Sequence, residues 1–146
     1  MQVAIAMTRE VRVASPSQTI QDAAAVMEEI DAGLLPVSEN DRLVGMISDR
    51  DIAIRAVAQG KGPQTTVRDV MTADVKYCFE DEDTEDVLRN MAEQQVRRVP
   101  VLNRDKRLVG ILSLGDLAAT ESPGIAGEAL AGISMPGGAH SQNGAR

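Results

Sequence analysis

The sequence has almost no aromatic side chains, one cysteine and one histidine, and these absences limit the chemistry that it can support. Its aromatic residues are Tyr77 and Phe79, so the core must be built from Val, Ile, Leu, Met and Ala. Cys78 cannot form an internal disulfide, and we interpret it as a small core residue on a strand rather than a nucleophile. His140 lies near the C-terminus, so neither a histidine-based metal site nor a catalytic triad is expected.

The sequence also lacks an excess of positive charge and any long apolar run. It has 15 Lys and Arg against 22 Asp and Glu, a formal net charge of −7, which argues against a nucleic-acid partner. No apolar run approaches the roughly 20 residues of a membrane span, and residues 1–7 do not resemble a signal peptide. We therefore expect a cytoplasmic protein with no membrane or nucleic-acid partner.

Motifs typical of common enzyme classes are missing as well. The chain contains neither a P-loop nor a GxGxxG fingerprint, and no residue stands out as a catalytic base. We therefore predict that the protein is not an enzyme, and that it requires no metal.

What the sequence does contain is a motif that occurs twice. Residues 99–116 read VPVLNRDKRLVGILSLGD, which predicts two short strands around a polar turn, followed by a helix start. Residues 35–51 read LPVSENDRLVGMISDRD, which is the same arrangement. In both copies a Ser precedes an Asp by three residues at the helix start. Such a repeat predicts two similar structural units.

Helix and strand signals surround the first copy of the motif. Thr19 and Asp22 have the spacing of a capping box, and apolar residues at helical spacing follow as far as a stop signal at residues 31–33. A second helix is predicted from Asp49 to Gly60. A short strand is predicted at residues 11–13.

The same order recurs about 64 residues later. After a linker at residues 61–66, Met71-Thr72 repeats Met7-Thr8, and a helix follows Asp83. Each half therefore reads strand, helix, strand, strand, helix, with the first domain at residues 1–60 and the second at 67–121. Since neither half is long enough to bury a good core alone, we expect an α/β fold in which a pseudo-twofold relates the halves and their sheets pack together.

Gly, Ala, Ser and Pro dominate residues 122–146. Their composition favours a flexible tail. The weak helical pattern from Ile125 to Ile133 allows the alternative that this segment is an arm that docks on a partner subunit.

The repeated frame resembles a tandem pair of cystathionine β-synthase (CBS) domains over roughly residues 3–120. The resemblance rests on two copies of an apolar-Pro-Val group and of a Gly-x-x-Ser-x-x-Asp group, in register within the same predicted elements. The Met-Thr opening and the sequence GMISDRDI at residues 45–52 are typical of short stand-alone CBS-pair proteins from bacteria.

The resemblance implies a binding site for an adenosine-containing ligand in each half. A carboxylate can accept two hydrogen bonds from a ribose diol, and a Ser at a helix start can reach a phosphate. In such families the Asp holds the ribose, the Ser or Thr holds the first phosphate, and the base lies beside the middle strand. The residues at these positions are Ser48, Asp51, Leu35, Pro36, Ser113, Asp116, Arg98, Val99 and Pro100, with Thr8 and Thr72 lining the same clefts.

A simpler interpretation of Ser48 with Asp51, and of Ser113 with Asp116, is an ordinary helix cap that needs no ligand. Basic residues crowd the second half at positions 97, 98, 104, 106 and 107, and either favour a polyphosphate beside the cleft or form a solvated strand end. The acidic run at residues 80–83 either opposes phosphate or is a solvated helix entry.

The resemblance further implies that two CBS pairs join into a homodimer through their helices. The predicted function is a regulatory, signal-transducing sensor that binds AMP, ADP, ATP, NAD or S-adenosylmethionine and acts on a protein target of unknown identity. The alternative is a structural or stress-response dimer with empty clefts. CBS pairs also occur inserted in IMP dehydrogenase, but a catalytic barrel does not fit in 146 residues.

Overall fold

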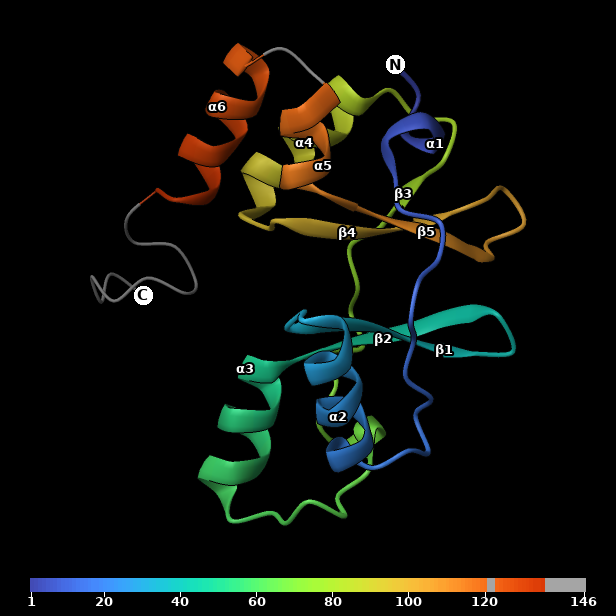
Figure 1. Ribbon diagram of the computed structural model, residues 1–146, viewed down its shortest axis with the longest axis vertical. Coiled ribbons are helices and arrows are strands. Elements are labelled where there is room, and N and C mark those ends of the chain that lie inside the picture. Colours follow the sequence, from blue (N-terminus) through green and yellow to red (C-terminus); the bar gives the residue numbers. More distant parts are fainter. Residues whose placement is uncertain (121–122, 136–146) are drawn as a thin grey trace. The chain divides into compact units, whose positions relative to one another are not determined.

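The computed structural model describes residues 1–120 and 123–135 and divides the chain into two compact units (Figure 1). The first-half unit comprises Val11–Lys76 together with Asp105–Leu108. The second-half unit comprises Met1–Glu10, Tyr77–Arg104 and the described residues from Val109 onward. Each unit therefore includes a segment from the other half of the sequence: Met1–Glu10 in the second-half unit and Asp105–Leu108 in the first-half unit.

The short segments that carry the Met-Thr pairs are exchanged between the two halves. Thr8 and Ile111 exchange two backbone hydrogen bonds of 2.9 Å, so the N-terminal segment belongs to the second-half unit. Thr72 pairs in the same way with Met46, with N–O distances of 2.8 and 2.9 Å, in the first-half unit. A helical turn precedes each Met-Thr dipeptide: α1 (Val3–Ala6) precedes Met7-Thr8, and the 3-10 turn η3 (Val67–Asp69) precedes Met71-Thr72.

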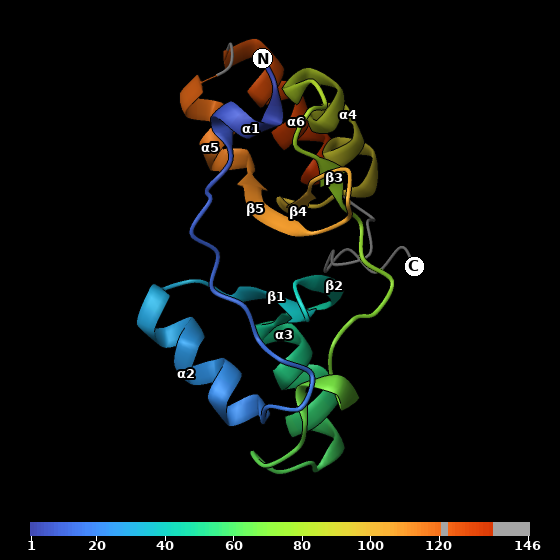
Figure 2. The same ribbon diagram turned by 90° about the vertical axis from the view of Figure 1, so that its right-hand side faces the viewer.

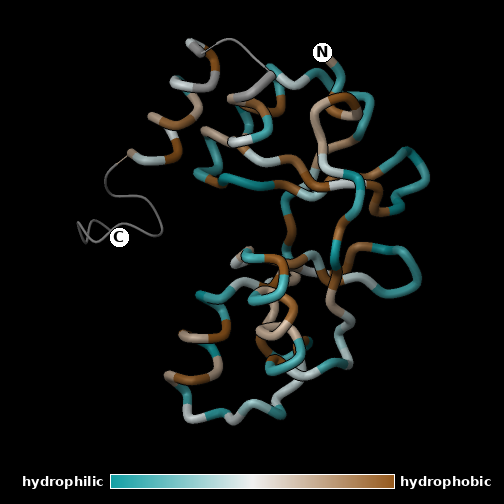
Figure 3. Tube along the Cα trace, in the orientation of Figure 1, coloured by the Kyte–Doolittle hydropathy of each residue, from teal (hydrophilic) through white to brown (hydrophobic). Residues whose placement is uncertain are grey.

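The sheet of the first-half unit is the predicted hairpin. Strands β1 (Leu34–Glu39) and β2 (Arg42–Ser48) are antiparallel, with Leu34 opposite Ser48 and Pro36 opposite Met46. Asn40 and Asp41, at φ of 55° and 63°, form the two-residue turn, a conformation that Asn and Asp tolerate. Figure 3 shows both hairpin turns as hydrophilic segments.

The second-half unit has a three-stranded sheet in the order β3-β4-β5. Strand β3 (Cys78–Phe79) runs parallel to β4 (Arg98–Leu102), and β5 (Leu108–Ser113) lies on the other side of β4. Cys78 is opposite Val101 and is buried, as the sequence predicts for a core residue on a strand.

The prediction of a strand at residues 11–13 is wrong. In this region only Ala14 pairs with the first-half sheet, through a bridge to Val37. This bridge is equivalent in the repeat to the pairing of Cys78 with Val101. In the second half the ladder continues when Glu80 N–H donates to the Leu102 carbonyl, at 2.9 Å. The matching residue in the first half is Pro16, which has no N–H, so this pairing ends after Ala14.

The helices follow the predicted starts and stops closely. Helix α2 (Ile20–Ile30) begins after Thr19, whose hydroxyl accepts from the Asp22 N–H, and ends at Asp31 in the left-handed region. Helix α4 (Thr84–Gln94) begins after Asp83 and ends in the same way at Gln95. After β2 the chain forms α3 (Asp49–Asp51), the π-helix η1 (Ile52–Ala56) and the 3-10 turn η2 (Val57–Gln59) before Gly60 at φ 77°.

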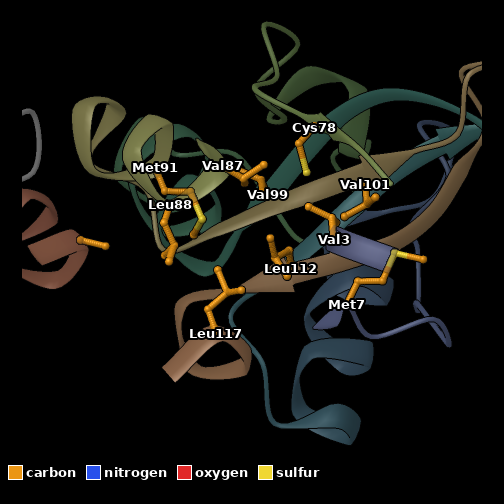
Figure 4. Packing of buried hydrophobic residues seen from close by; sticks show 11 residues of the cluster. Val3, Met7, Cys78, Val87, Leu88, Met91, Val99, Val101, Leu112 and Leu117 are labelled. Atoms are coloured by element: carbon orange, nitrogen blue, oxygen red, sulfur yellow. The ribbon is translucent and has the colours of Figure 1, made fainter. Parts of the chain in front are cut away.

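Each unit has its own buried apolar cluster, although the sequence suggested that neither half would bury a good core alone. In the first-half unit the cluster includes Leu35, Val37 and Ile47, all 0% exposed. In the second-half unit Leu88, Met91 and other side chains from β4, β5 and the helices meet residues of the exchanged N-terminal segment (Figure 4). The exchanged segments thus complete both clusters.

The C-terminal region contains a helix where composition favours a flexible tail. Helix α5 (Leu114–Thr120) is followed by α6 (Pro123–Ile133), which lies alongside α4 (Figure 2). Ala129 is 3% exposed, and the Gln95 side-chain amide donates to the carbonyls of Gly132 and Met135 at 3.3 and 3.4 Å. The remainder of the predicted tail, including His140, lies outside the described residues.

Candidate functional site

A Ser and an Asp form a reciprocal capping box at the start of the helix in each half. Ser48 Oγ accepts from the Asp51 N–H at 3.0 Å, and Asp51 Oδ2 accepts from the Ser48 N–H at 3.0 Å. The corresponding distances for Ser113 and Asp116 are 3.0 and 3.1 Å. The helix-cap interpretation is therefore realised in both halves, and it uses one oxygen of each carboxylate.

The second carboxylate oxygen of Asp51 is not used by the cap and faces an arginine. Asp51 Oδ1 lies 3.8 Å from Arg55 Nε, and the Asp51 side chain is 16% exposed. Arg55 also donates from Nη1 to the Met71 carbonyl at 3.2 Å. Because a carboxylate oxygen can accept two hydrogen bonds, Asp51 has capacity for a ligand hydroxyl while it caps its own helix.

The exchanged Met-Thr segments lie against the strands that lead into these capping boxes. Thr72 pairs with Met46 on β2, two residues before Ser48, and Thr8 pairs with Ile111 on β5, two residues before Ser113. The structure therefore groups Thr72 with Ser48 and Asp51, and Thr8 with Ser113 and Asp116. The predicted domain bounds, residues 1–60 and 67–121, put Thr8 with the first half and Thr72 with the second, whereas each Thr pairs with a strand of the opposite half.

Two glycines allow this close approach. A Cβ atom on Gly45 would lie 2.7 Å from Met71 Sδ and 2.9 Å from the Thr72 carbonyl oxygen. A Cβ on Gly110 would lie 2.6 Å from Met7 Sδ and 2.9 Å from the Thr8 carbonyl oxygen. The motif glycine is therefore required for packing of the exchanged segment.

The apolar-Pro groups lie on the neighbouring strand in each unit. Leu35 and Pro36 of β1 are buried and pair with Ile47 and Met46, so they lie beside the strand that ends in Ser48. Val99 and Pro100 are the buried counterparts on β4. Arg98 begins β4 and is exposed.

The structure thus brings the predicted site residues together as two sets, one in each unit. The first set is Thr72, Leu35, Pro36, Ser48 and Asp51, and the second is Thr8, Arg98, Val99, Pro100, Ser113 and Asp116.

Sequence reasoning missed a pair of residues next to the first capping box. The Asp49 carboxylate covers Gly33, where a Cβ would lie 2.6 Å from Asp49 Oδ2, and the Gly33 carbonyl accepts from the Asp49 N–H at 2.9 Å. At the matching positions Leu114 N–H donates to the Arg97 carbonyl, also at 2.9 Å. A comparison of the two repeats position by position could have found this difference.

The acidic run at residues 80–83 is bound to other groups of the second-half unit. Arg104 makes two hydrogen bonds to the Asp81 carboxylate, at 2.7 and 2.9 Å, and stacks on the Phe79 ring at 4.1 Å. The hydrogen bonds from Arg104 hold the pKa of Asp81 below its usual value.

The Cys78 thiol is a separate case. Burial, with a smaller contribution from the charge of Glu82, raises the pKa of Cys78 to about 12.

Within the described residues, no three His, Cys, Asp or Glu side chains gather closely enough to hold a metal ion. The helices of this described part are also too short or too polar to span a bilayer.

A family model for the CBS domain matches the chain twice, at residues 2–57 and 67–121. The chain belongs to the CBS domain family. The CBS domain-containing protein YhcV of Bacillus subtilis is 44% identical over 129 residues, which cover 88% of this chain and 91% of YhcV. The two matched regions confirm that the protein contains a tandem CBS pair.

Solved CBS-pair structures share this fold. The structure of Hypoxic Response Protein I with two coordinated zinc ions has a TM-score of 0.76 and 35% identity, covering 84% of this chain and all of that one. The CBS pair of protein MJ0100 in complex with 5′-methylthioadenosine and S-adenosyl-L-methionine has a TM-score of 0.72 and 28% identity, covering 82% and 94%. CBSX2 in complex with AMP has a TM-score of 0.71 and 30% identity, covering 81% and 93%.

Proposed function

We propose that this CBS pair is a regulatory module that binds an adenosine-containing nucleotide in each half and signals to a protein partner. The observation that carries the proposal is the duplicated Ser–Asp group, placed in each unit beside an apolar-Pro strand and an exchanged Thr. Two solved CBS pairs of similar fold hold adenosyl compounds, which supports the same ligand class here.

The chemistry of each set of residues suits such a ligand. The Asp carboxylate accepts the two ribose hydroxyls, while the Ser hydroxyl at the helix start donates to the 5′ substituent. Apolar surface beside the Pro of the middle strand packs against the base. AMP, ADP, ATP, NAD and S-adenosylmethionine all contain the required adenosine unit. No part of this proposal needs a metal or a catalytic step.

A second candidate is a structural or stress-response homodimer whose sites stay empty. The capping boxes favour it, because Ser48 with Asp51 and Ser113 with Asp116 already satisfy each other without a ligand. The similar fold of Hypoxic Response Protein I, whose name refers to a stress condition, also favours a role in stress.

Differential scanning fluorimetry with an adenosyl panel separates the two candidates. Binding to the native state raises the unfolding midpoint by mass action, by an amount that grows with ligand concentration. Guanosine compounds serve as the matched control, since they keep the ribose and phosphate but change the base. No shift with any adenosyl compound at millimolar concentration contradicts the sensor function and favours the structural dimer.

A further inference from the structure

The two candidate sites differ in charge at matched positions of the repeat. Gly33, Leu34, Asp49 and Asp51 of the first half correspond to Arg97, Arg98, Leu114 and Asp116 of the second. The same backbone hydrogen bond occurs in both halves: Asp49 N–H donates to the Gly33 carbonyl, and Leu114 N–H to the Arg97 carbonyl, each at 2.9 Å. Only the side chains differ, and they change the formal charge of these four positions from −2 to +1.

In the first half a second carboxylate lies next to the capping box. Asp49 lies over Gly33 so closely that no side chain fits there, and its Oδ1 accepts from the Arg50 N–H at 2.8 Å. Two basic residues lie on the same helical segment. Arg55 contacts the Asp51 carboxylate and the Met71 carbonyl, whereas Arg50 is exposed, so the local formal charge does not become positive.

In the second half two arginines lie at the strand end beside the capping box, where the Arg97 carbonyl accepts from the Leu114 N–H at 2.9 Å. Arg97 and Arg98 are exposed, and neither forms an ion pair with another residue in the described part of the chain. Arg98 corresponds to Leu34, which is paired directly with Ser48 in the first half. The second-half site keeps the capping carboxylate, Asp116, but has Leu114 at the position that Asp49 occupies in the first half.

We propose that the two sites select adenosine compounds by the charge of the 5′ substituent. The second-half site, with Arg97 and Arg98, takes a 5′-phosphorylated adenosine. The first-half site, with Asp49, takes an adenosine whose 5′ substituent carries no negative charge, such as a thioether or a sulfonium. The carboxylate of Asp49 repels a phosphate, while the guanidinium groups of Arg97 and Arg98 attract it. This inference rests on the proposed function of both sites.

Isothermal titration of the full chain tests the assignment with AMP and 5′-methylthioadenosine as probes. The two compounds share the base and ribose and differ only at the 5′ position. Asp51→Ala leaves the second-half site for measurement, and Asp116→Ala leaves the first. We expect AMP to bind Asp51→Ala at least about tenfold more tightly than Asp116→Ala, and 5′-methylthioadenosine to show the opposite order or no preference.

Charge variants separate selectivity from a general loss of the site. Arg97→Ala should weaken AMP by about fivefold, and leave 5′-methylthioadenosine within about twofold, as expected for an exposed charge contact. Asp49→Asn keeps the shape over Gly33 but removes the charge, so it should strengthen AMP binding at the first-half site. Glu28→Gln removes an exposed charge from α2 and is the matched control, with no change in either affinity.

The outcomes distinguish this inference from the function on which it rests. If neither compound binds the wild-type chain, the proposed function fails, and the charge selection fails with it. If both compounds bind but AMP prefers the first-half site or binds both sites equally, only the charge selection is overturned. The same holds if Asp49→Asn and Arg97→Ala leave the ratio of the AMP and 5′-methylthioadenosine affinities unchanged. Weaker AMP binding at higher salt, without a change for 5′-methylthioadenosine, supports it.

Discussion

Replacement of Gly110 by Ala should detach the N-terminal segment from the second-half unit. The added Cβ would lie 2.6 Å from Met7 Sδ and 2.9 Å from the Thr8 carbonyl oxygen. Met7 is 8% exposed and has little free space, and Thr8 cannot shift without breaking its two 2.9 Å hydrogen bonds to Ile111. The substitution therefore forces a choice between a clash and lost backbone pairing.

The size of the effect follows from these two alternatives. Overpacking costs about 1–3 kcal/mol, and each lost backbone hydrogen bond adds about 0.5–1.5 kcal/mol. Since relief of the clash sacrifices the hydrogen bonds, the terms do not add fully, and we expect a destabilisation of about 2–4 kcal/mol. Gly62→Ala is the matched control, because a Cβ at Gly62 meets no atom within 4 Å; it should change stability by less than about 0.5 kcal/mol.

Urea unfolding and amide hydrogen exchange measure this effect together. In Gly110→Ala the unfolding midpoint should fall, and the amides of Thr8 and Ile111 should lose protection. The amides of Met46 and Thr72, which form the equivalent pair in the first-half unit, should keep theirs. Equal midpoints for Gly110→Ala and Gly62→Ala, or unchanged protection at Ile111, would show that the close approach of the exchanged segment is wrong.

Three further predictions use other parts of the structure. Burial raises the pKa of Cys78 from 9.0 to about 12, so the stability that the buried thiol contributes is complete below pH 9 and is lost as the pH rises toward 12. Between these values the free energy of unfolding should fall by up to about 1.4 kcal/mol per pH unit. A Cys78→Ala chain should lack this component of the pH dependence. Ser48→Ala should destabilise the first-half unit by about 0.5–2 kcal/mol in chemical denaturation, and an unchanged midpoint would exclude a structural role for this cap. Gly132→Ala should loosen α6 from α4 and speed proteolysis of α6, because the added Cβ would lie 2.9 Å from Ala92 Cβ. Gly127→Ala is the control, since a Cβ at Gly127 meets no atom within 4 Å. Equal proteolysis of the two variants would contradict the docking of α6.

The sequence is sufficient to predict those parts of the fold that depend on local chemistry. The β1–β2 hairpin follows from two apolar runs around Asn40, and the helix starts follow from Thr19 and Ser48 with their partners three residues on. The capping boxes of the candidate site are equally local. The spacing of Ser and Asp is therefore enough to locate them, and the CBS family confirms the frame around them.

Features that depend on distant contacts were not predictable. The repeat places Met7-Thr8 in the first half and Met71-Thr72 in the second, and nothing in the local sequence shows that each segment pairs with the opposite half. Pairing in the first half is a single bridge at Ala14, after residues 11–13, because Pro16 lacks the N–H with which Glu80 extends the ladder in the other copy. The sequence assigns Gly33 to a helix stop, but Asp31 adopts the left-handed conformation there, and Gly33 instead makes room for Asp49.

Composition alone also misjudged part of the C-terminal region. Residues 123–133 are rich in Gly and Ala, which favours disorder when the segment is considered by itself. In the structure these small residues allow α6 to approach α4, where Gly132 meets Ala92. Whether this helix also contacts a second copy of the chain, as the predicted homodimer arm requires, stays a prediction that light scattering of a chain truncated after residue 121 tests.

Isothermal titration of AMP against the wild-type chain, Asp51→Ala and Asp116→Ala tests the central claim most directly. If Asp116 accepts both ribose hydroxyls, its loss removes two charge-assisted hydrogen bonds and should weaken binding by about 2–4 kcal/mol, or about 30- to 1000-fold. The cap itself contributes about 0.5–2 kcal/mol to folding, so both variants should remain folded at 25 °C. Unchanged AMP affinity in both variants, with a lower melting temperature instead, would mean that these aspartates only cap their helices.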